Sequence, residues 1–289
     1  MRLRENIVGA LIAVLAFSFA TQSLFAEKVL FVHGMSLTES NEDCQDQVSC
    51  DYWSTVTPAV GDYTIVGYDG RKNPFVATPT AGSVRLLEML NKYCRADQGQ
   101  SCRIVADSLG GFTTAGTVAM YNTNGVYNIL NSTQIVSAEG GSEIANLGDG
   151  AIEVLKAVLG IGYLLENAWG AVEALVTTNA RGLFDHNRNN GTLFYHVAAR
   201  KSVFVAAQIL PGKDDSLVAF HSSCGYRTTG GFKKCMGQKI RDCGWCFWQK
   251  REHIDPWEGH LMHPANGIKG VKLRHAPTHN EVEFHTLAD

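Results

Sequence analysis

The stretch Arg103-Ile104-Val105-Ala106-Asp107-Ser108-Leu109-Gly110-Gly111 decides the fold that this chain is expected to adopt. An apolar run leads directly to Ser108, and two glycines and a helix-compatible run follow within a few residues. A strand that turns this tightly into a helix requires small residues two positions before and two positions after the serine. Ala106 and Gly110 meet that requirement, although Gly is the usual residue at the first position. The pattern predicts a nucleophile elbow, and a serine that only caps a helix is the alternative.

Short apolar runs recur along the chain and predict strands that are covered on both faces, as in a parallel sheet. They lie at 28–32, 63–68, 103–106, 134–138, 202–210 and 271–273. Helix-like segments such as Ala81–Tyr93 separate the earlier runs, and this alternation predicts βαβ units in one doubly wound sheet. We therefore expect one α/β domain over residues 27–289, with a mostly parallel sheet of about six strands and helices on both faces.

The N-terminus has the features of an export signal. Two arginines precede an apolar run over residues 7–20 that is too short for a transmembrane helix. Small residues predict cleavage after Ala20 or after Ala26, so residues 1–26 are interpreted as a signal peptide, with an uncleaved anchor as the alternative. The chain is thus expected to be secreted or periplasmic.

The composition argues against one class of function. The chain has 289 residues, with 25 Lys and Arg against 28 Asp and Glu, and its formal net charge is −3. This balance gives no electrostatic reason to expect nucleic acid as a partner. The hydrophobic fraction of 45% is that of a globular protein with a sizeable core.

All eight cysteines lie downstream of the export signal, and an even number in an exported chain predicts disulfides. They are Cys44, Cys50, Cys94, Cys102, Cys224, Cys235, Cys243 and Cys246. Cys44 and Cys50, and likewise Cys94 and Cys102, are close in sequence within polar segments, so we pair each with its neighbour. The last four lie in a loop-rich insertion, 224–264, and their pairing stays open. We interpret the CGWC sequence there as structural, since no thioredoxin-like strand precedes it.

Residues 149–180 are apolar on more than one side and carry spaced glycines. The longest uncharged run, Ala157–Leu165, is far shorter than the roughly 20 residues that span a bilayer. The segment predicts two helices that either form a mobile cap over a site or cover one edge of the sheet permanently. In the second case Leu155, Leu159, Leu164 and Trp169 would stay packed against the sheet.

The segment His33-Gly34-Met35 directly follows the first expected strand. In this position the backbone N–H of Met35 can join that of Leu109 in an oxyanion hole, the pair of donors that stabilises a tetrahedral intermediate. His33 itself is interpreted as a packing residue that shapes the loop.

A serine nucleophile also needs a histidine base, which a carboxylate orients. The turn after the 202–210 run carries Asp214 and Asp215, and either of them can supply that carboxylate. Since the base follows the acid in chain order, we favour His279, which comes after the last expected strand, 269–274. His253 and His260, in the insertion, are the alternatives. No HExxH or paired CxxC pattern accompanies the histidines, so no metal is expected.

Four motifs of the chain resemble the secreted lipase-like branch of the α/β-hydrolase superfamily. They are FVHGM at 31–35, IVADSLGG at 104–111, SAEGGSEIA at 137–145 and LPGKDDSLVAFHSSCG at 210–225. The resemblance runs from Lys28 to the C-terminus and leaves 150–200 and 225–268 unmatched. In that branch the aspartate directly before a small residue, Leu and Val is the triad acid, which implies Asp215.

The resemblance implies hydrolysis of acyl esters through an acyl-enzyme, without a cofactor. Ser108 would attack the ester, His279 would transfer the proton, and Asp215 would orient the imidazole. The expected partner is an ester or lipid substrate, with transient contact to a lipid interface and no obligate protein partner. Two other functions remain open: a non-catalytic lipid- or partner-binding protein with this fold, and an acyltransferase or thioesterase with the same triad.

Overall fold

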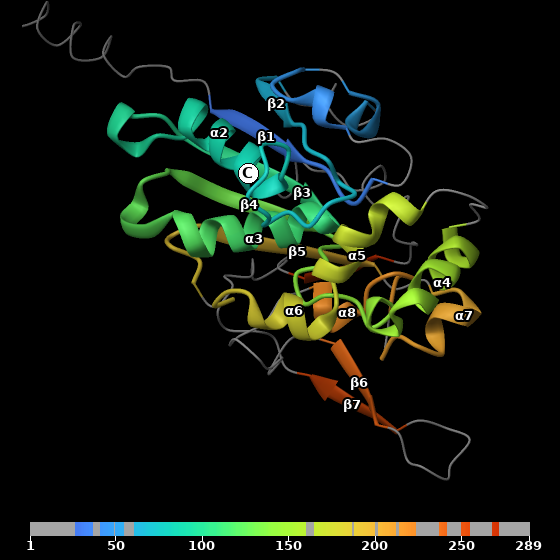
Figure 1. The fold of residues 1–289 in the computed structure, drawn as a ribbon. Coiled ribbons are helices and arrows are strands. Elements are labelled where there is room, and N and C mark those ends of the chain that lie inside the picture. Colours follow the sequence, from blue (N-terminus) through green and yellow to red (C-terminus); the bar gives the residue numbers. More distant parts are fainter. Residues whose placement is uncertain are drawn as a thin grey trace, which may run out of the picture.

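The computed structural model describes residues 27–36, 41–48, 50–54, 61–159, 165–186, 188–199, 202–211, 214–223, 237–241, 250–254 and 268–271. At its centre is a six-stranded sheet with the order β2-β1-β3-β4-β5-β8, in which all neighbouring strands are parallel (Figure 1). The strands are β1 (Lys28–Val32), β2 (Tyr63–Val66), β3 (Cys102–Asp107), β4 (Ile129–Ile135), β5 (Leu193–Ala199) and β8 (Ile268–Val271). The expected parallel α/β sheet is confirmed.

The described helices connect these strands and cover the sheet. The α-helices are α2 (Gly82–Tyr93), α3 (Leu109–Tyr121), α4 (Asp149–Leu159), α5 (Trp169–Ala174), α6 (Thr177–Gly182), α7 (Phe204–Ala207) and α8 (Phe220–Ser223). The 3-10 helices are η1 (Glu42–Cys44), η2 (Asp51–Trp53), η4 (Ala96–Gln98), η5 (Thr123–Gly125), η6 (Ala145–Leu147) and η7 (Leu165–Ala168). A separate antiparallel pair, β6 (Gly237–Arg241) and β7 (Lys250–Ile254), lies within the cysteine-rich insertion.

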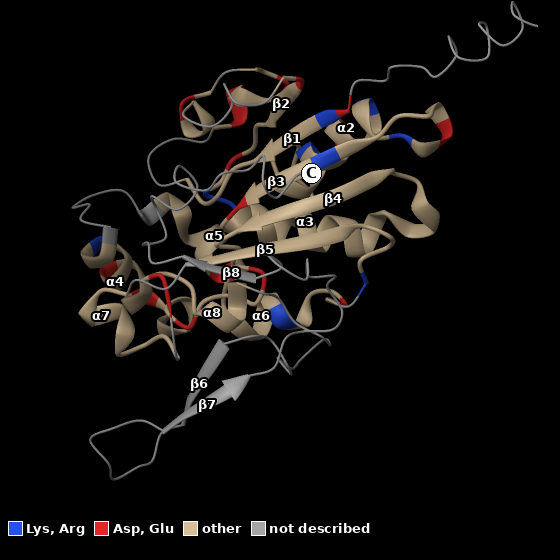
Figure 2. Cartoon of the chain, turned by 180° about the vertical axis from the view of Figure 1, so that it is seen from behind, with Lys and Arg blue, Asp and Glu red and all other residues tan. Residues whose placement is uncertain are grey.

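The central strands are buried on both faces because successive side chains point to opposite sides of a sheet. Leu30 and Val32 of β1 pack with the cluster under α2 and α3, whereas Phe31 packs on the other face. On that second face the ring of Trp53, from η2, lies 5.0 Å from the ring of Phe31. Figure 2 shows that Lys and Arg on β1 and β3 lie at the starts of these strands, away from their buried middles.

One predicted strand is wrong. The 202–210 run forms α7 and a turn, and the strand in this part of the sheet is β5 instead. In α7 the side chains of Phe204 and Val205 are exposed, while Ala206 and Leu210 are buried four residues apart. This is helical spacing, and a short apolar run does not reveal by itself whether it is strand or helix. The last strand is also shifted, to Ile268–Val271 from the expected 269–274.

The first two predicted disulfides are confirmed, since Cys44 is bonded to Cys50 and Cys94 to Cys102. The other four cysteines, Cys224, Cys235, Cys243 and Cys246, lie outside the described residues, as does the predicted signal peptide. Across the described ranges, no helix is both long enough and apolar enough to cross a membrane.

Candidate active site

The carboxyl ends of parallel strands meet at one edge of a sheet, and at this edge the structure places Ser108 beside the loop that carries Met35. β1 ends at Val32 and continues into residues 33–35, the predicted oxyanion loop, while β3 ends at Asp107 and continues into Ser108. The loop lies tightly against the serine, because a Cβ built on Gly34 would be 2.9 Å from Cβ of Ser108. Figure 1 shows α4, α5 and α7 gathered at this same end of the sheet.

Ser108 occupies a strained turn between β3 and α3. Its φ of 50° and ψ of −116° lie in a region that non-glycine residues rarely adopt, which is the backbone shape of a nucleophile elbow. Hydrogen bonds maintain the strain: the Ser108 N–H donates to the Ile135 carbonyl at 2.9 Å, and the Ser108 carbonyl accepts the N–H groups of Gly111 and Ala138, each at 3.0 Å. Such strain is typical of functional sites.

The small residues around Ser108 have a steric reason. A Cβ built on Gly110 would lie 2.4 Å from the carbonyl oxygen of His33 and 2.5 Å from that of Val32. The elbow helix therefore touches the backbone of the oxyanion loop, and only glycine fits between them. The N–H of Leu109 is one of the N-terminal amides of α3 that a helix leaves without a partner inside the helix.

An apolar pocket of about 390 Å³, which includes space open to solvent, adjoins Ser108. It is lined by Met35, Ser108, Ser142, Ile144, Ala145, Leu155, Val172, Leu175, Leu217 and Val218. Three of these residues, Leu155 of α4, Val172 of α5 and Leu175, come from the 149–180 segment. The sequence also singles out Trp169, Leu159 and Leu164 in this segment. Trp169 is partly exposed, and the side chains of Leu159 and Leu164 lie outside the described residues.

The loop that carries the candidate acids borders the same pocket. Asp215 is fully buried, and its Oδ1 accepts the N–H groups of Leu217 at 2.9 Å and Val218 at 2.8 Å. The Leu217 carbonyl in turn accepts the hydroxyl of Ser142 at 2.6 Å. Burial raises the pKa of the neighbouring Asp214 to about 6.

Known proteins resemble this chain in structure. No family model matches the sequence, and no curated protein sequence matches it. The mature form of a Bacillus licheniformis lipase is 15% identical, with 92% of each chain covered and a TM-score of 0.56. Lipase 1 from Pelosinus fermentans is 12% identical, with 89% of this chain and 94% of the other covered and a TM-score of 0.52.

This chain has the α/β-hydrolase fold. The order and direction of its strands, the elbow after β3 and the likeness to these two lipases agree on that point. At such low sequence identity the likeness concerns the fold alone, so the activity has to be argued from this chain's own residues.

In an α/β-hydrolase the triad residues follow one another along the chain in the order serine, acid, histidine. Here His260, His279 and the side chain of His253 lie outside the described residues. The backbone of β8 is nevertheless informative, because it runs parallel to β5 and ends at Val271. The chain thus leaves the sheet at the edge where Ser108 lies. Within the described ranges, no group of three or more metal-ligating side chains is found.

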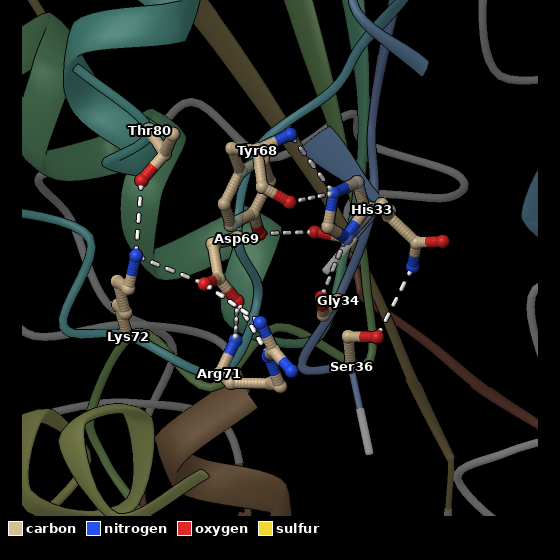
Figure 3. A network of polar contacts seen from close by, with 9 residues as sticks. His33, Gly34, Ser36, Tyr68, Asp69, Arg71, Lys72 and Thr80 are labelled. Atoms are coloured by element: carbon tan, nitrogen blue, oxygen red, sulfur yellow. Dashed lines mark hydrogen bonds and ion pairs between the residues drawn. The ribbon is translucent and has the colours of Figure 1, made fainter. Parts of the chain in front are cut away.

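His33 is buried in the oxyanion loop and remains neutral, because burial lowers its pKa to about 4. Its Nδ1–H donates to the Gly34 carbonyl at 2.8 Å, and its Nε2 faces the backbone of Tyr68 (Figure 3). The ring also stacks on that of Tyr68, with centroids 3.9 Å apart. These contacts agree with a loop-shaping role rather than proton transfer.

Two contacts of the site carry no clear signal in the sequence. The Tyr52 hydroxyl donates to Oδ2 of Asp107 at 2.5 Å and accepts the N–H of Gly34 at 3.1 Å. Asp107 belongs to the elbow motif, but its partner Tyr52 lies in the polar segment beside a disulfide, where no spacing or motif marks it.

Two polar pairs hold α6 and the residues after it. Arg181 of α6 donates to Oε1 of Glu143 at 2.8 Å, and Nδ1 of His186 lies 2.9 Å from Oε1 of Glu139. Both glutamates follow β4, and burial raises the pKa of Glu139. These pairs join α6 and the residues after it to the segment that follows β4.

Proposed function

We propose that this chain is a serine hydrolase of the lipase/esterase type, which cleaves carboxylic esters through an acyl-enzyme. The observation that carries the proposal is Ser108, held at a strained strand-to-helix turn beside an apolar pocket. A serine on such a turn is exposed to substrate at the top of the sheet, and the amides beside it can bind an oxyanion.

In the proposed reaction Ser108 Oγ attacks the ester carbonyl while His279 accepts the serine proton. The N–H groups of Met35 and Leu109 stabilise the oxyanion of the tetrahedral intermediate. His279 then gives the proton to the leaving alcohol, and the acyl group remains on Ser108. Water, activated by the same histidine, releases the carboxylic acid and restores the serine.

Asp215 is proposed as the residue that orients His279 and stabilises the imidazolium. Its support is its complete burial and the two backbone N–H donors that fix the direction of its carboxylate. His279 is proposed because it follows β8 in the sequence, and the carboxyl end of β8 lies at the same edge of the sheet as Ser108. His253 and His260 remain the alternatives that the experiment must test.

The pocket favours an apolar acyl group as the part of the substrate that lies next to Ser108. Most of its walls are aliphatic side chains, among them Leu155, Val172 and Leu217. Burial of an acyl chain against them would contribute about 0.8 kcal/mol per CH₂ group. We therefore expect esters of longer acyl chains to be better substrates than acetates.

The segment 149–180 is proposed to act as a cap over this pocket, in keeping with the position of Leu155, Val172 and Leu175. Activity that rises sharply when the substrate forms an emulsion would support a lipase with an opening cap. Simple saturation through the solubility limit would instead support an esterase whose helices stay in place.

Export from the cytoplasm is part of the proposal. The two disulfides suit an oxidising compartment, and the basic residues and apolar run of residues 1–26 suit a signal peptide. N-terminal sequencing of the protein from the culture medium or periplasm should find the chain starting at residue 21 or 27. A start at Met1 would contradict this part.

The decisive experiment is hydrolysis of p-nitrophenyl esters of increasing acyl length by wild type and by Ser108→Ala. We expect loss of all activity in the variant with an unchanged thermal midpoint. His279→Ala should be equally inactive, whereas His275→Ala, in the same terminal segment, should keep its activity and serves as the matched control. Activity retained in Ser108→Ala would refute the nucleophile, and retained activity in His279→Ala would direct the test to His253 and His260.

A further inference from the structure

The tyrosine–aspartate pair of Tyr52 and Asp107 connects two parts of the site that are far apart in sequence. Asp107 directly precedes the proposed nucleophile and is only 2% exposed. Tyr52 donates its hydroxyl hydrogen to this carboxylate at 2.5 Å, and the same oxygen accepts the N–H of Gly34 at 3.1 Å. A single phenolic oxygen thus bridges the elbow and the oxyanion loop.

The Tyr52 bridge restrains the oxyanion loop at Gly34. Gly34 precedes Met35, the proposed oxyanion donor, and glycine is the residue least restricted in its backbone angles. The peptide unit between them is held on its carbonyl side, where the Gly34 oxygen accepts the Nδ1–H of His33 at 2.8 Å. Since a peptide bond is planar and trans, this contact turns the Met35 N–H to the opposite side. The Tyr52 oxygen holds the other side of Gly34, at its N–H.

The space around this contact leaves little room for another arrangement. A Cβ built on Gly34 would lie 2.7 Å from the Tyr52 hydroxyl oxygen and 2.9 Å from Oδ2 of Asp107. The backbone of the loop therefore packs directly on the tyrosine–aspartate pair, and a displacement of the tyrosine would be transmitted to the loop.

Tyr52 is itself firmly held. Cys50 precedes η2 and is bonded to Cys44, and Trp53 is completely buried against Phe31. Burial and the neighbouring Asp107 raise the pKa of Tyr52 well above its ordinary value, so the hydroxyl keeps its proton and remains a donor. The Tyr52–Asp107 pair can therefore hold the elbow and the oxyanion loop in a fixed relative position.

We propose that Tyr52, with Asp107 as its acceptor, is a positioning residue that fixes the oxyanion loop for catalysis. This inference rests on the proposed function, because it assigns the pair a task in ester hydrolysis at Ser108. Neither side chain takes part in bond making: the tyrosine restrains Gly34, and the restraint orients the Met35 N–H.

The test compares Tyr52→Phe with Tyr93→Phe. Tyr93 is a matched control, since its hydroxyl also donates to an aspartate at 2.5 Å, in this case Asp46 within the Cys44–Cys50 loop and away from Gly34. Tyr52→Phe should lower kcat by about tenfold or more, up to the roughly hundredfold loss known for removal of one oxyanion donor, with KM nearly unchanged. Tyr93→Phe should keep the wild-type kcat.

A transition-state analogue gives a second measurement. A trifluoromethyl ketone forms a tetrahedral adduct whose oxygen occupies the oxyanion hole, so Tyr52→Phe should weaken its binding by about the same factor as kcat. Inhibition by the product carboxylic acid should be unchanged. An equal loss in both inhibitors would indicate general distortion of the site and would overturn the positioning role.

Variants at Asp107 keep the inference testable even if Tyr52→Phe does not fold. Asp107→Asn retains an oxygen that accepts the Tyr52 hydroxyl and should stay close to wild type in kcat. Asp107→Leu has a similar shape but no acceptor and should lose activity as Tyr52→Phe does. Equal activities of these two variants would overturn the inference.

Failure of this inference differs from failure of the proposed function. A folded wild type that hydrolyses none of the esters refutes the proposed function, and the catalytic task of the pair with it. An active wild type whose Tyr52→Phe variant keeps full kcat refutes the positioning role alone. Hydrogen exchange at the Gly34 amide, expected to accelerate in Tyr52→Phe but not in Tyr93→Phe, reports the contact without any substrate.

Discussion

The buried imidazole of His33 should make folding stability depend on pH in a way that can be measured. Burial lowers its pKa from 6.5 to about 4, whereas the unfolded chain keeps the ordinary value. Between these two values the unfolded state binds the proton and the folded state does not. The contribution of His33 to the unfolding free energy is therefore constant above pH 6.5 and is lost as the pH falls toward 4.

The magnitude follows from the two pKa values. Each pH unit within the interval from 6.5 to about 4 is worth about 1.4 kcal/mol, which gives a total loss of about 3 kcal/mol for one histidine. Asp214 acts in the opposite direction, because its raised pKa of about 6 makes the folded state bind its proton first as the pH falls. The pH dependence of the wild type alone is therefore a mixture of opposing contributions.

Comparison with His33→Asn isolates the histidine. Urea unfolding of both chains between pH 7.5 and 4.5 gives two free-energy curves, and Asp214 and the other shared groups cancel in their difference. The stability advantage of the wild type should be constant above pH 6.5 and should shrink by about 1.4 kcal/mol per pH unit below it. Burial also lowers the pKa of His196 to about 4, so His196→Asn serves as a positive control, for which the same pH dependence is expected. A difference that stays constant down to pH 4.5 would refute the reasoning.

Three further outcomes can be checked. Gly110→Ala should lose about 1–3 kcal/mol of stability and most esterase activity, because the new Cβ meets two backbone carbonyl oxygens within 2.5 Å; an unchanged thermal midpoint would contradict the tight elbow packing. Leu155→Ala should enlarge the pocket and raise the ratio of kcat/KM for long over short acyl esters, and an unchanged ratio would exclude this residue from the acyl pocket. Replacing both Cys94 and Cys102 by alanine should lower the unfolding free energy by about 2–3 kcal/mol in urea unfolding, and no loss would argue against a stabilising bridge.

Local spacing in the sequence was sufficient for the elbow, most of the strands and two disulfides. Ser108 follows an apolar run and precedes two glycines, so the short-range pattern already specifies a tight strand-to-helix turn. The pairing of Cys44 with Cys50 and of Cys94 with Cys102 was predictable for the same reason. Each depends on residues that are close in sequence, where chain geometry allows few alternatives.

Contacts between distant segments could not be predicted in this way. The 202–210 run reads equally well as strand or helix, and only the packing of Ala206 and Leu210 decides for a helix. The strand β5, which was not among the expected strands, pairs with β4, because pairing in a sheet is decided by long-range contacts.

The same division applies to the candidate site. The sequence by itself determined which serine stands on the turn and which loop follows β1, since both depend on neighbouring residues. Only the tertiary structure brought the hydroxyl of Tyr52 to Asp107 and Gly34, and Leu155 and Val172 to the pocket beside Ser108. Those contacts join segments that have no shared period or motif, so they exist only once the parallel strands have brought their carboxyl ends to one edge.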